Sequence, residues 1–157
     1  MVQIRSAKPE DAELIYQFIY HKAEFDRNLG GYSGEIKTTV ENIRQTLFKD
    51  RPFAFVLIAE AEVAIGFALY YFRYSSFAGV PSIWLDDLFI NPDMRNHGAG
   101  TLLMNRLLQI AKDNNCSRMP RVVRPSPNST LPSALALICR ATSPVNTPPV
   151  WKVRIVS

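Results

Sequence analysis

The chain has 157 residues, the size of a single domain and enough to bury a hydrophobic core. The sequence turns polar directly after Met1, and no apolar run reaches the roughly 18 to 20 residues that a membrane span needs. We therefore expect no signal peptide and no membrane anchor. The two cysteines, Cys116 and Cys139, have no metal-binding spacing, and a cytoplasmic location is the simplest interpretation.

The net charge of +4 is unevenly distributed. Residues 1–118 contain 13 Lys and Arg and all 14 Asp and Glu, whereas residues 119–157 contain 5 Lys and Arg and no acid. Nucleic-acid binding usually needs a basic patch on a folded face, and here the basic excess belongs to the tail. We therefore expect no nucleic-acid partner.

The first third of the chain predicts a strand and two helices. Val2 to Ser6 has the pattern of a strand, and Pro9 fits the first turn of a helix in which Glu10 and Asp11 favour the positive end of the dipole. Apolar residues then repeat at helical spacing, at Leu14, Ile15, Phe18, Ile19 and Ala23.

A glycine-bearing loop over residues 27–34 separates the first helix from the second. The spacing Thr38-x-x-Glu41 predicts a capping box at the start of the second helix. Val40, Ile43 and Leu47 then mark its buried face.

The middle of the chain predicts three strands and a third helix. Phe53 to Ala59 is apolar on both faces, which indicates a central strand. Val63 to Tyr74 and Ser82 to Ile90 follow as two further strands. The helix is expected from Gly98 to Asn114, and its inner stripe consists of Leu103, Leu107 and Ile110.

The segment between the last strand and the third helix predicts an anion site. A helix start presents backbone N–H groups and the positive end of the dipole, which suit a pyrophosphate. Gly98 and Gly100 allow close backbone approach, and Arg95 adds charge-assisted donors. A dinucleotide-binding fold or a P-loop fits worse, because neither glycine motif is present.

The pattern Arg95-x-x-Gly98-x-Gly100 resembles the acetyl-CoA loop of the GNAT N-acetyltransferases. Residues 65–74 and 84–90 resemble the diamine (spermidine/spermine) N-acetyltransferase-like branch of that family. The resemblance covers about residues 1–118. It implies an α/β (α+β) GNAT fold, in which helices flank a mixed central sheet.

The resemblance also implies acetyl-CoA as cosubstrate and no metal. The pantetheine arm is expected along the backbone of the last strand, where the N–H of Leu88 would polarise the thioester carbonyl. The expected acetyl-CoA-binding residues are Leu88, Phe89, Ile90, Arg95, Asn96, His97, Gly98, Ala99, Gly100 and Thr101.

Asp86 and Asp87 are the candidate catalytic side chains. Neighbours in a regular strand point to opposite faces, so one of these carboxylates would meet the core unless a bulge or a splayed strand turns it outward. An acid at this place in the family receives the proton of the amine or binds its ammonium group. The alternative is one solvated acid and one acid that caps a loop.

Four further residues are candidates for substrate binding. Asp26, with Glu24 nearby, lies where related enzymes often place an acid, although a solvated helix end explains it equally well. Tyr74 and Trp84 are candidates for the amine pocket, with core packing as the alternative. Polyamine-specific members carry an acid in the loop after Tyr74, where this chain has Ser75-Ser76-Phe77, so a smaller or lysine-like amine is favoured.

The composition changes after Arg118. Residues 119–157 contain seven of the eleven prolines and no glycine. Pro132 limits any helix or strand over residues 131–138, and we expect loop or disorder in the rest. We therefore divide the chain into a GNAT core, 1–118, and an atypical tail, 119–157, which would arise from a shifted reading frame or a replaced terminus.

The tail also affects the expected fold and chemistry. The C-terminal strands of the family are expected to be missing or atypical, which leaves the fourth strand at a sheet edge. The resemblance also implies a tyrosine that donates a proton to the leaving thiolate. This general acid is absent here, because no tyrosine follows Tyr74.

The favoured function is acetyl transfer from acetyl-CoA to a primary amine of a small polyamine, diamine or lysine-like substrate, by direct attack. One alternative is a catalytically impaired acyl-CoA-binding protein with an incomplete GNAT fold. Another is a nucleic-acid binder, which would rest on the tail alone. Family members often dimerise, so a homodimer is left open.

Overall fold

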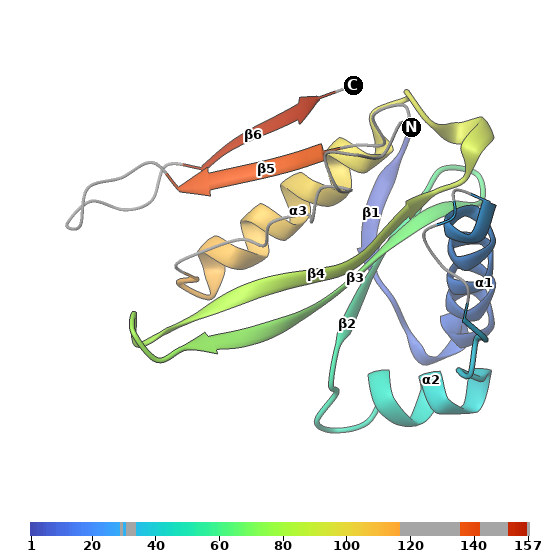
Figure 1. The fold of residues 1–157 in the computed structure, drawn as a ribbon, viewed down its shortest axis with the longest axis horizontal. Helices are drawn as coiled ribbons and strands as arrows, with labels where there is room; N and C mark the ends of the chain where they lie inside the picture. Colours follow the sequence, from blue (N-terminus) through green and yellow to red (C-terminus); the bar gives the residue numbers. More distant parts are fainter. Residues whose placement is uncertain (29, 31–33, 117–135, 142–150, 157) are drawn as a thin grey trace. The chain divides into compact units, whose positions relative to one another are not determined.

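The computed structural model describes residues 1–28, 30, 34–116, 136–141 and 151–156 (Figure 1). The chain contains both helices and strands, and a four-stranded sheet is packed with helices, which confirms the predicted α/β (α+β) class. In chain order the elements are β1 (Gln3–Ser6), η1 (Pro9–Asp11), α1 (Ala12–Asn28), α2 (Val40–Leu47), β2 (Phe55–Glu60), β3 (Ala64–Ser75), β4 (Val80–Ile90), η2 (Pro92–Met94), α3 (Ala99–Asp113), β5 (Ala136–Ala141) and β6 (Trp151–Val156).

The strands form two sheets. A four-stranded sheet has the order β1-β2-β3-β4, and β5 pairs with β6 in a separate two-stranded sheet. The β1–β2 and β2–β3 pairs are antiparallel, with Ile4 opposite Ala59 and Ile58 opposite Phe67. Because β4 ends the order, it is an edge strand within the part of the chain that the structure describes, as predicted for the fourth strand.

The chain forms two compact units. The first comprises residues 1–70 and 87–103, and the second comprises residues 71–86 and 104–157. Strands β3 and β4 and helix α3 therefore contribute residues to both units.

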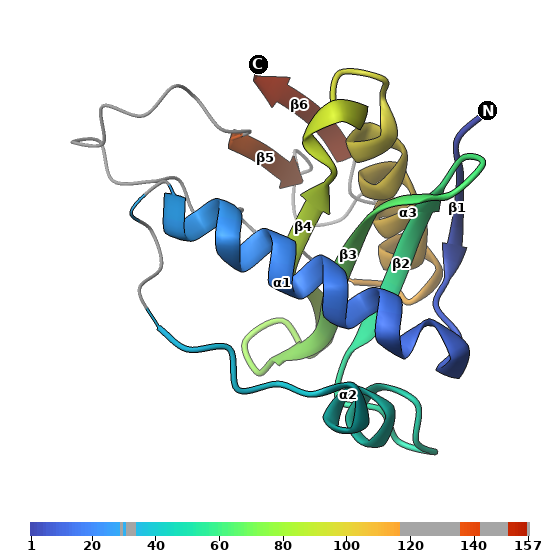
Figure 2. The same ribbon diagram turned by 90° about the vertical axis from the view of Figure 1, so that its right-hand side faces the viewer.

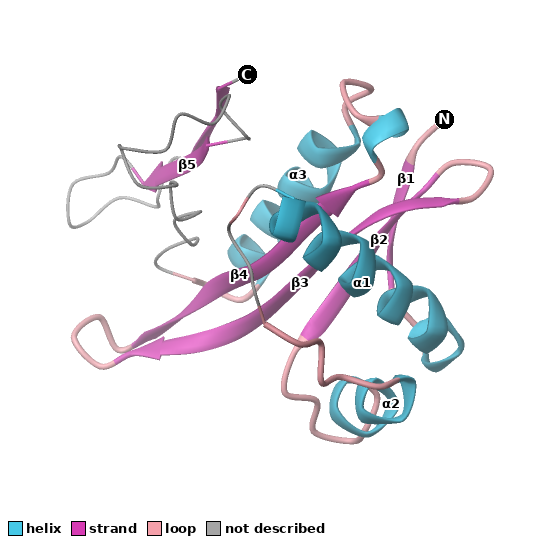
Figure 3. Ribbon diagram, turned by 45° about the vertical axis from the view of Figure 1, so that its right-hand side comes forward, coloured by secondary structure: helices cyan, strands magenta, loops and turns pink. Residues whose placement is uncertain are grey.

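In the first unit, α1 covers one face of the sheet (Figures 2 and 3). The predicted helical stripe is confirmed at Ile15 and Phe18, which are buried, and Leu14 and Ile19 pack against the same cluster. The Phe18 ring stacks on that of Phe67 in β3, with centroids 5.5 Å apart. The buried cluster consists of Ala12, Ile15, Phe18, Ile43, Val56, Ile58, Phe67 and Phe89.

Asp11 fixes the turn that leads into α1. It accepts a hydrogen bond from the Lys8 backbone N–H at 2.7 Å, as expected for an acid at a helix start. Its carboxylate also accepts hydrogen bonds from both Nη atoms of Arg5, at 2.7 and 2.9 Å. Arg5 Nε donates a hydrogen bond to the Glu60 carboxylate at 2.7 Å. The Arg5 hydrogen bonds lower the pKa of Asp11. Arg5 of β1 thus links Glu60 of β2 to the ionised Asp11 before α1.

The capping residue of α2 is Thr39, not the predicted Thr38. The Thr39 hydroxyl accepts the backbone N–H of Asn42 at 3.1 Å. The two adjacent threonines offer equivalent caps in sequence, and the register of α2 decides between them because Ile43 must be buried.

The second unit contains the β3–β4 turn and most of α3. The Trp84 ring lies beside the Tyr71 ring at 6.5 Å, and the Arg73 guanidinium lies over it at 4.9 Å. The predicted stripe of α3 is confirmed at Leu107, which is fully buried, whereas Ile110 is only partly buried.

Strands β5 and β6 correct the expectation for the tail. Loop or disorder was predicted over residues 151–156, but this segment pairs with residues 136–141 in an antiparallel ladder. Both segments are rich in β-branched and apolar residues, which favour strands. They pair with each other in a sheet of their own. Residues 117–135, 142–150 and 157, and residues 29 and 31–33 of the loop predicted over 27–34, lie outside the described residues.

Candidate active site

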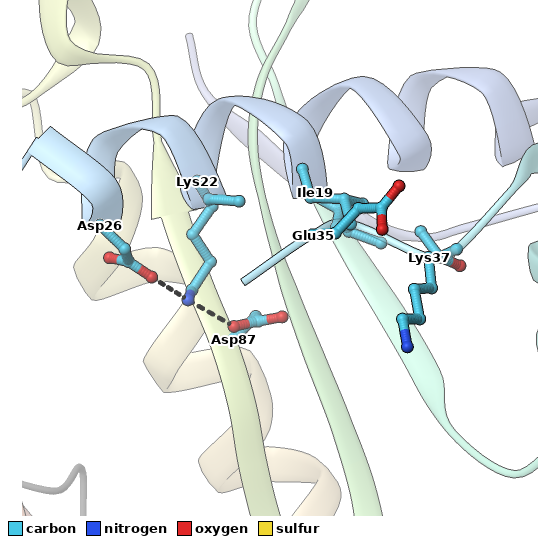
Figure 4. A pocket seen from close by; sticks show the side chains of 9 residues that line it. Ile19, Lys22, Asp26, Glu35, Lys37 and Asp87 are labelled. Atoms are coloured by element: carbon cyan, nitrogen blue, oxygen red, sulfur yellow. Dashed lines mark hydrogen bonds and ion pairs between the residues drawn. The ribbon is translucent and has the colours of Figure 1, made fainter. Parts of the chain in front are cut away.

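Asp87 lies near the end of β4 and forms an ion pair with α1. Its Oδ1 is 2.9 Å from the Lys22 ammonium, which is also 2.6 Å from Oδ2 of Asp26 (Figure 4). The side chain of Asp87 is 22% exposed, so its charge is partly removed from water. The ion pair with Lys22 therefore offsets the cost of removing this carboxylate from water. A bulge or a splayed strand is the other way in which an acid in a strand could avoid this cost.

Lys22 is held by two opposite charges. It lies one helical turn before Asp26, at the i,i+4 spacing that places both side chains on one face of α1. Burial alone would lower the pKa of the Lys22 ammonium, but the hydrogen bonds and charges of Asp26 and Asp87 outweigh it, and the pKa is raised. Lys22 is therefore a protonated primary amine between two carboxylates.

These side chains line an open pocket of about 260 Å³. The volume is slightly below the roughly 300–1,000 Å³ of sites for drug-sized ligands, so the pocket suits a small ligand or the end of a longer one. The lining residues are Ile19, Lys22, Ala23, Asp26, Glu35, Ile36, Lys37, Thr38 and Asp87.

The predicted anion loop begins at the end of β4. Arg95 Nε donates to the Ile90 carbonyl at 3.1 Å, and the Arg95 guanidinium lies 4.4 Å from the ring centroid of Phe25. Phe25 directly precedes Asp26, and Asp87 lies three residues before Ile90. The pocket carboxylates and the loop are thus joined through the ends of the same two elements, α1 and β4.

The structure accounts for the two glycines of the loop, Gly98 and Gly100, in different ways. Gly98 has a φ of +81°, a backbone conformation that favours glycine, and its carbonyl accepts the first α3 hydrogen bond from Leu102. A Cβ at Gly100 would meet no atom of the described chain within 4 Å. The fold itself therefore leaves space at Gly100, which suits close approach of a ligand.

Among the other predicted loop residues, Asn96 and His97 are exposed in this turn, whereas Ala99 is buried. Asn96 has a φ of +64°, which asparagine tolerates, and His97 Nδ1 lies 2.7 Å from the Arg95 carbonyl. Ala99, Gly100 and Thr101 form the first turn of α3, where backbone N–H groups have no partner within the helix.

The structure brings Asp26 and Asp87 together and places the other candidates elsewhere. Asp86 is exposed on β4, and Glu24 forms an ion pair with Arg27; neither lines the pocket. Tyr74 is 73% exposed and Trp84 packs on Arg73, both in the second unit.

Sequence reasoning missed Lys22, Glu35 and Lys37. The i,i+4 spacing of Lys22 and Asp26 was visible, but a helix-surface ion pair is the usual meaning of such spacing. The contact with Asp87 joins positions 65 residues apart, and no local pattern signals it.

Comparison with known proteins identifies the class. Residues 16–130 match the Acetyltransferase (GNAT) family, and the chain therefore belongs to that family of acetyltransferases. It is 32% identical to thialysine N-epsilon-acetyltransferase from Bos taurus, over 75% of this chain and 72% of the relative. It is 30% identical to spermidine/spermine N(1)-acetyltransferase-like protein 1 from Homo sapiens, over 74% of this chain and 17% of the relative.

Solved structures support the fold. A possible acetyltransferase from Clostridium difficile 630 matches with a TM-score of 0.66 and 17% identity, over 82% of this chain and 83% of that one. The ribosomal-protein-alanine N-acetyltransferase from Brucella melitensis matches with a TM-score of 0.60 and 21% identity, over 78% and 82%.

The described residues contain neither a membrane-spanning helix nor a metal-binding cluster. No helix there combines the length and the apolar character that crossing a membrane requires. The same residues contain no group of three or more His, Cys, Asp or Glu side chains arranged to hold a metal ion.

Proposed function

We propose that this protein transfers an acetyl group from acetyl-CoA to a primary amine of a small polyamine, diamine or lysine-like substrate, by direct attack. The observation that carries the proposal is the position of the Lys22 ammonium, which forms ion pairs with both Asp26 and Asp87. Three acids and two lysines line this pocket, so its net negative charge attracts a substrate that carries an ammonium group.

Acetyl-CoA would bind where β4 ends. The edge backbone of Leu88, Phe89 and Ile90 offers N–H and C=O groups for the amide-bearing pantetheine arm, and the turn from Arg95 to Thr101 offers N–H groups for the pyrophosphate. This arrangement would place the thioester beside the pocket, because Asp87 directly precedes Leu88.

The chemistry needs a neutral amine. In the proposed step the amine nitrogen attacks the thioester carbonyl, the new C–N bond forms, and the C–S bond breaks to release coenzyme A. Asp87 would attract the ammonium, and Asp86, which is exposed and does not line the pocket, would receive its proton through a relay of water molecules. The backbone N–H of Leu88 would stabilise the oxyanion.

The names of the relatives support a lysine-like or polyamine substrate. Thialysine and spermidine/spermine both appear in these names, and both are primary amines on flexible chains. The serine pair Ser75-Ser76, where polyamine-specific members carry an acid, favours the lysine-like end of this range.

The test is an acetylation assay with acetyl-CoA and lysine-like or polyamine acceptors. Asp87→Asn should raise KM for the amine more than it lowers kcat, and Asp86→Asn should lower kcat with little change in KM for acetyl-CoA. Asp93→Asn is the matched control, since Asp93 is an exposed acid of η2 outside the pocket. Normal kinetics in both Asp86 and Asp87 variants would contradict these roles.

A second function is favoured by one observation, the absence of any tyrosine after Tyr74. Without an acid for the leaving thiolate, the chain would bind acyl-CoA and turn over poorly. Tight coenzyme A binding by calorimetry, together with no acetyl transfer to any amine tested, would favour this non-catalytic function.

A further inference from the structure

Lys22 occupies the place in the pocket that is best suited to a cation. Its ammonium lies within 2.9 Å of carboxylate oxygens from two elements, Asp26 on α1 and Asp87 on β4. Its side chain is 28% exposed and lines the pocket. Figure 4 shows the ammonium between the two acids.

We infer that Lys22 sets the charge preference of the amine pocket, because its ammonium takes the position that a second ammonium group of a polycationic substrate would otherwise take. The pocket then favours amines that carry one positive charge over diamines and triamines. This inference rests on the proposed function and specifies its substrate class.

The charges that line the pocket support this inference. Three acids, Asp26, Asp87 and Glu35, face two lysines, Lys22 and Lys37, which leaves one net negative charge. Removing the Lys22 charge would leave two. A second substrate ammonium entering the present pocket meets the Lys22 ammonium a few ångströms away, and like charges at that distance repel strongly at a partly buried site.

A structural role for the same ion pair predicts a different result. If Lys22 only held α1 against β4, its loss would weaken folding and reduce affinity for every amine equally. A role in charge preference changes the ratio of affinities between amines of different charge. The ratio therefore separates the two roles.

The experiment measures binding by calorimetry for three probes, butylamine, 1,4-diaminobutane and spermidine. Lys22→Met and Lys22→Gln remove the charge, and the glutamine keeps a hydrogen-bond donor for the carboxylates. Lys22→Arg keeps the charge. Lys49→Met is the matched control, since Lys49 lies over the Phe53 ring outside the pocket.

Lys22→Met and Lys22→Gln should raise the affinity for spermidine relative to butylamine by about tenfold, the effect of one removed repulsion at a solvated site. Lys22→Arg and Lys49→Met should leave the ratio unchanged. An unchanged ratio in both charge-removing variants overturns the inference. If neither variant folds, the wild type decides: it should bind butylamine at least as tightly as spermidine, and tighter binding of spermidine overturns the inference.

The outcome is independent of turnover. If no amine is acetylated but the affinity ratio shifts, the proposed function fails and the role of Lys22 stands. If amines are acetylated and the ratio does not shift, the opposite holds.

Discussion

At the scale of single residues, Arg95 connects three parts of the first unit. Its guanidinium lies over Phe25 of α1, its Nε donates to the Ile90 carbonyl of β4, and its backbone begins the turn before α3. An arginine fixed by its neighbours loses little side-chain entropy when it binds a phosphate. This position suits a pre-organised anion site.

Arg95→Ala should lower the affinity for coenzyme A about ten- to a hundredfold, since charge-assisted hydrogen bonds are worth roughly 1.5–3 kcal/mol. Arg95→Lys keeps the charge but loses the planar fork, so we expect an intermediate loss. Calorimetry with coenzyme A measures both. Unchanged affinity in the alanine variant, with an unfolding midpoint close to that of the wild type, would contradict the assignment of this loop.

At the scale of elements, β3 and β4 approach closely at Gly66. A Cβ at this position would lie 2.4 Å from the Phe89 carbonyl oxygen and 2.5 Å from Ile90 Cδ1, and the Asn91 N–H donates to Ile65 at 2.9 Å. Backbone atoms cannot move aside as a flexible side chain can. Glycine at position 66 therefore sets the path of β4 directly after Asp87.

Gly66→Ala should destabilise the protein by about 1–3 kcal/mol, as overpacking of a close contact does. Gly100→Ala is the matched control, because its Cβ meets nothing within 4 Å and alanine favours a helix. Urea unfolding should show a lower midpoint for Gly66→Ala alone. Equal midpoints for both variants would show that β3 and β4 separate at little cost.

The secondary-structure elements show which parts of the fold could be predicted from the sequence. Hydrophobic periodicity predicted the first four strands and the three helices, with ends that differ by one or two residues for all four strands and for α3. Local patterns also indicated the turn from Arg95 to Gly100. The ion pair between Lys22 and Asp87 could not be predicted, because it depends on a contact between α1 and β4 that forms only when the sheet has folded. The pairing of β5 with β6 was missed, because proline-rich composition outweighed two short β-forming segments.

At the scale of the whole molecule, stability should depend on acid pH through Asp11. Its pKa is lowered in the folded protein, so it contributes stability above its ordinary value of 3.8 and loses that contribution as pH falls through the lower, folded value. Urea midpoints of the wild type should therefore fall steeply below about pH 4. Asp11→Asn should flatten this part of the profile, and an identical slope in both proteins would contradict the role of the Arg5–Asp11 pair.

The tail gives a second prediction for the molecule as a whole. A version whose residues 119–157 are restored from the corrected reading frame should unfold at higher urea and acetylate amines faster, if that frame encodes the strands and the acid for the thiolate that the resemblance implies. Equal urea midpoints and equal turnover in the two proteins would show that this tail, with β5 and β6, already performs both tasks.

The edge position of β4 has a consequence for handling the protein. Exposed strand edges seed intermolecular pairing, and the edge at Leu88 to Ile90 is the one that the pantetheine arm would cover. Cosubstrate and self-association would then compete for one row of backbone groups, so coenzyme A should act as an anti-aggregation agent. Light scattering of concentrated samples would decrease as coenzyme A is added, at concentrations that match its measured Kd.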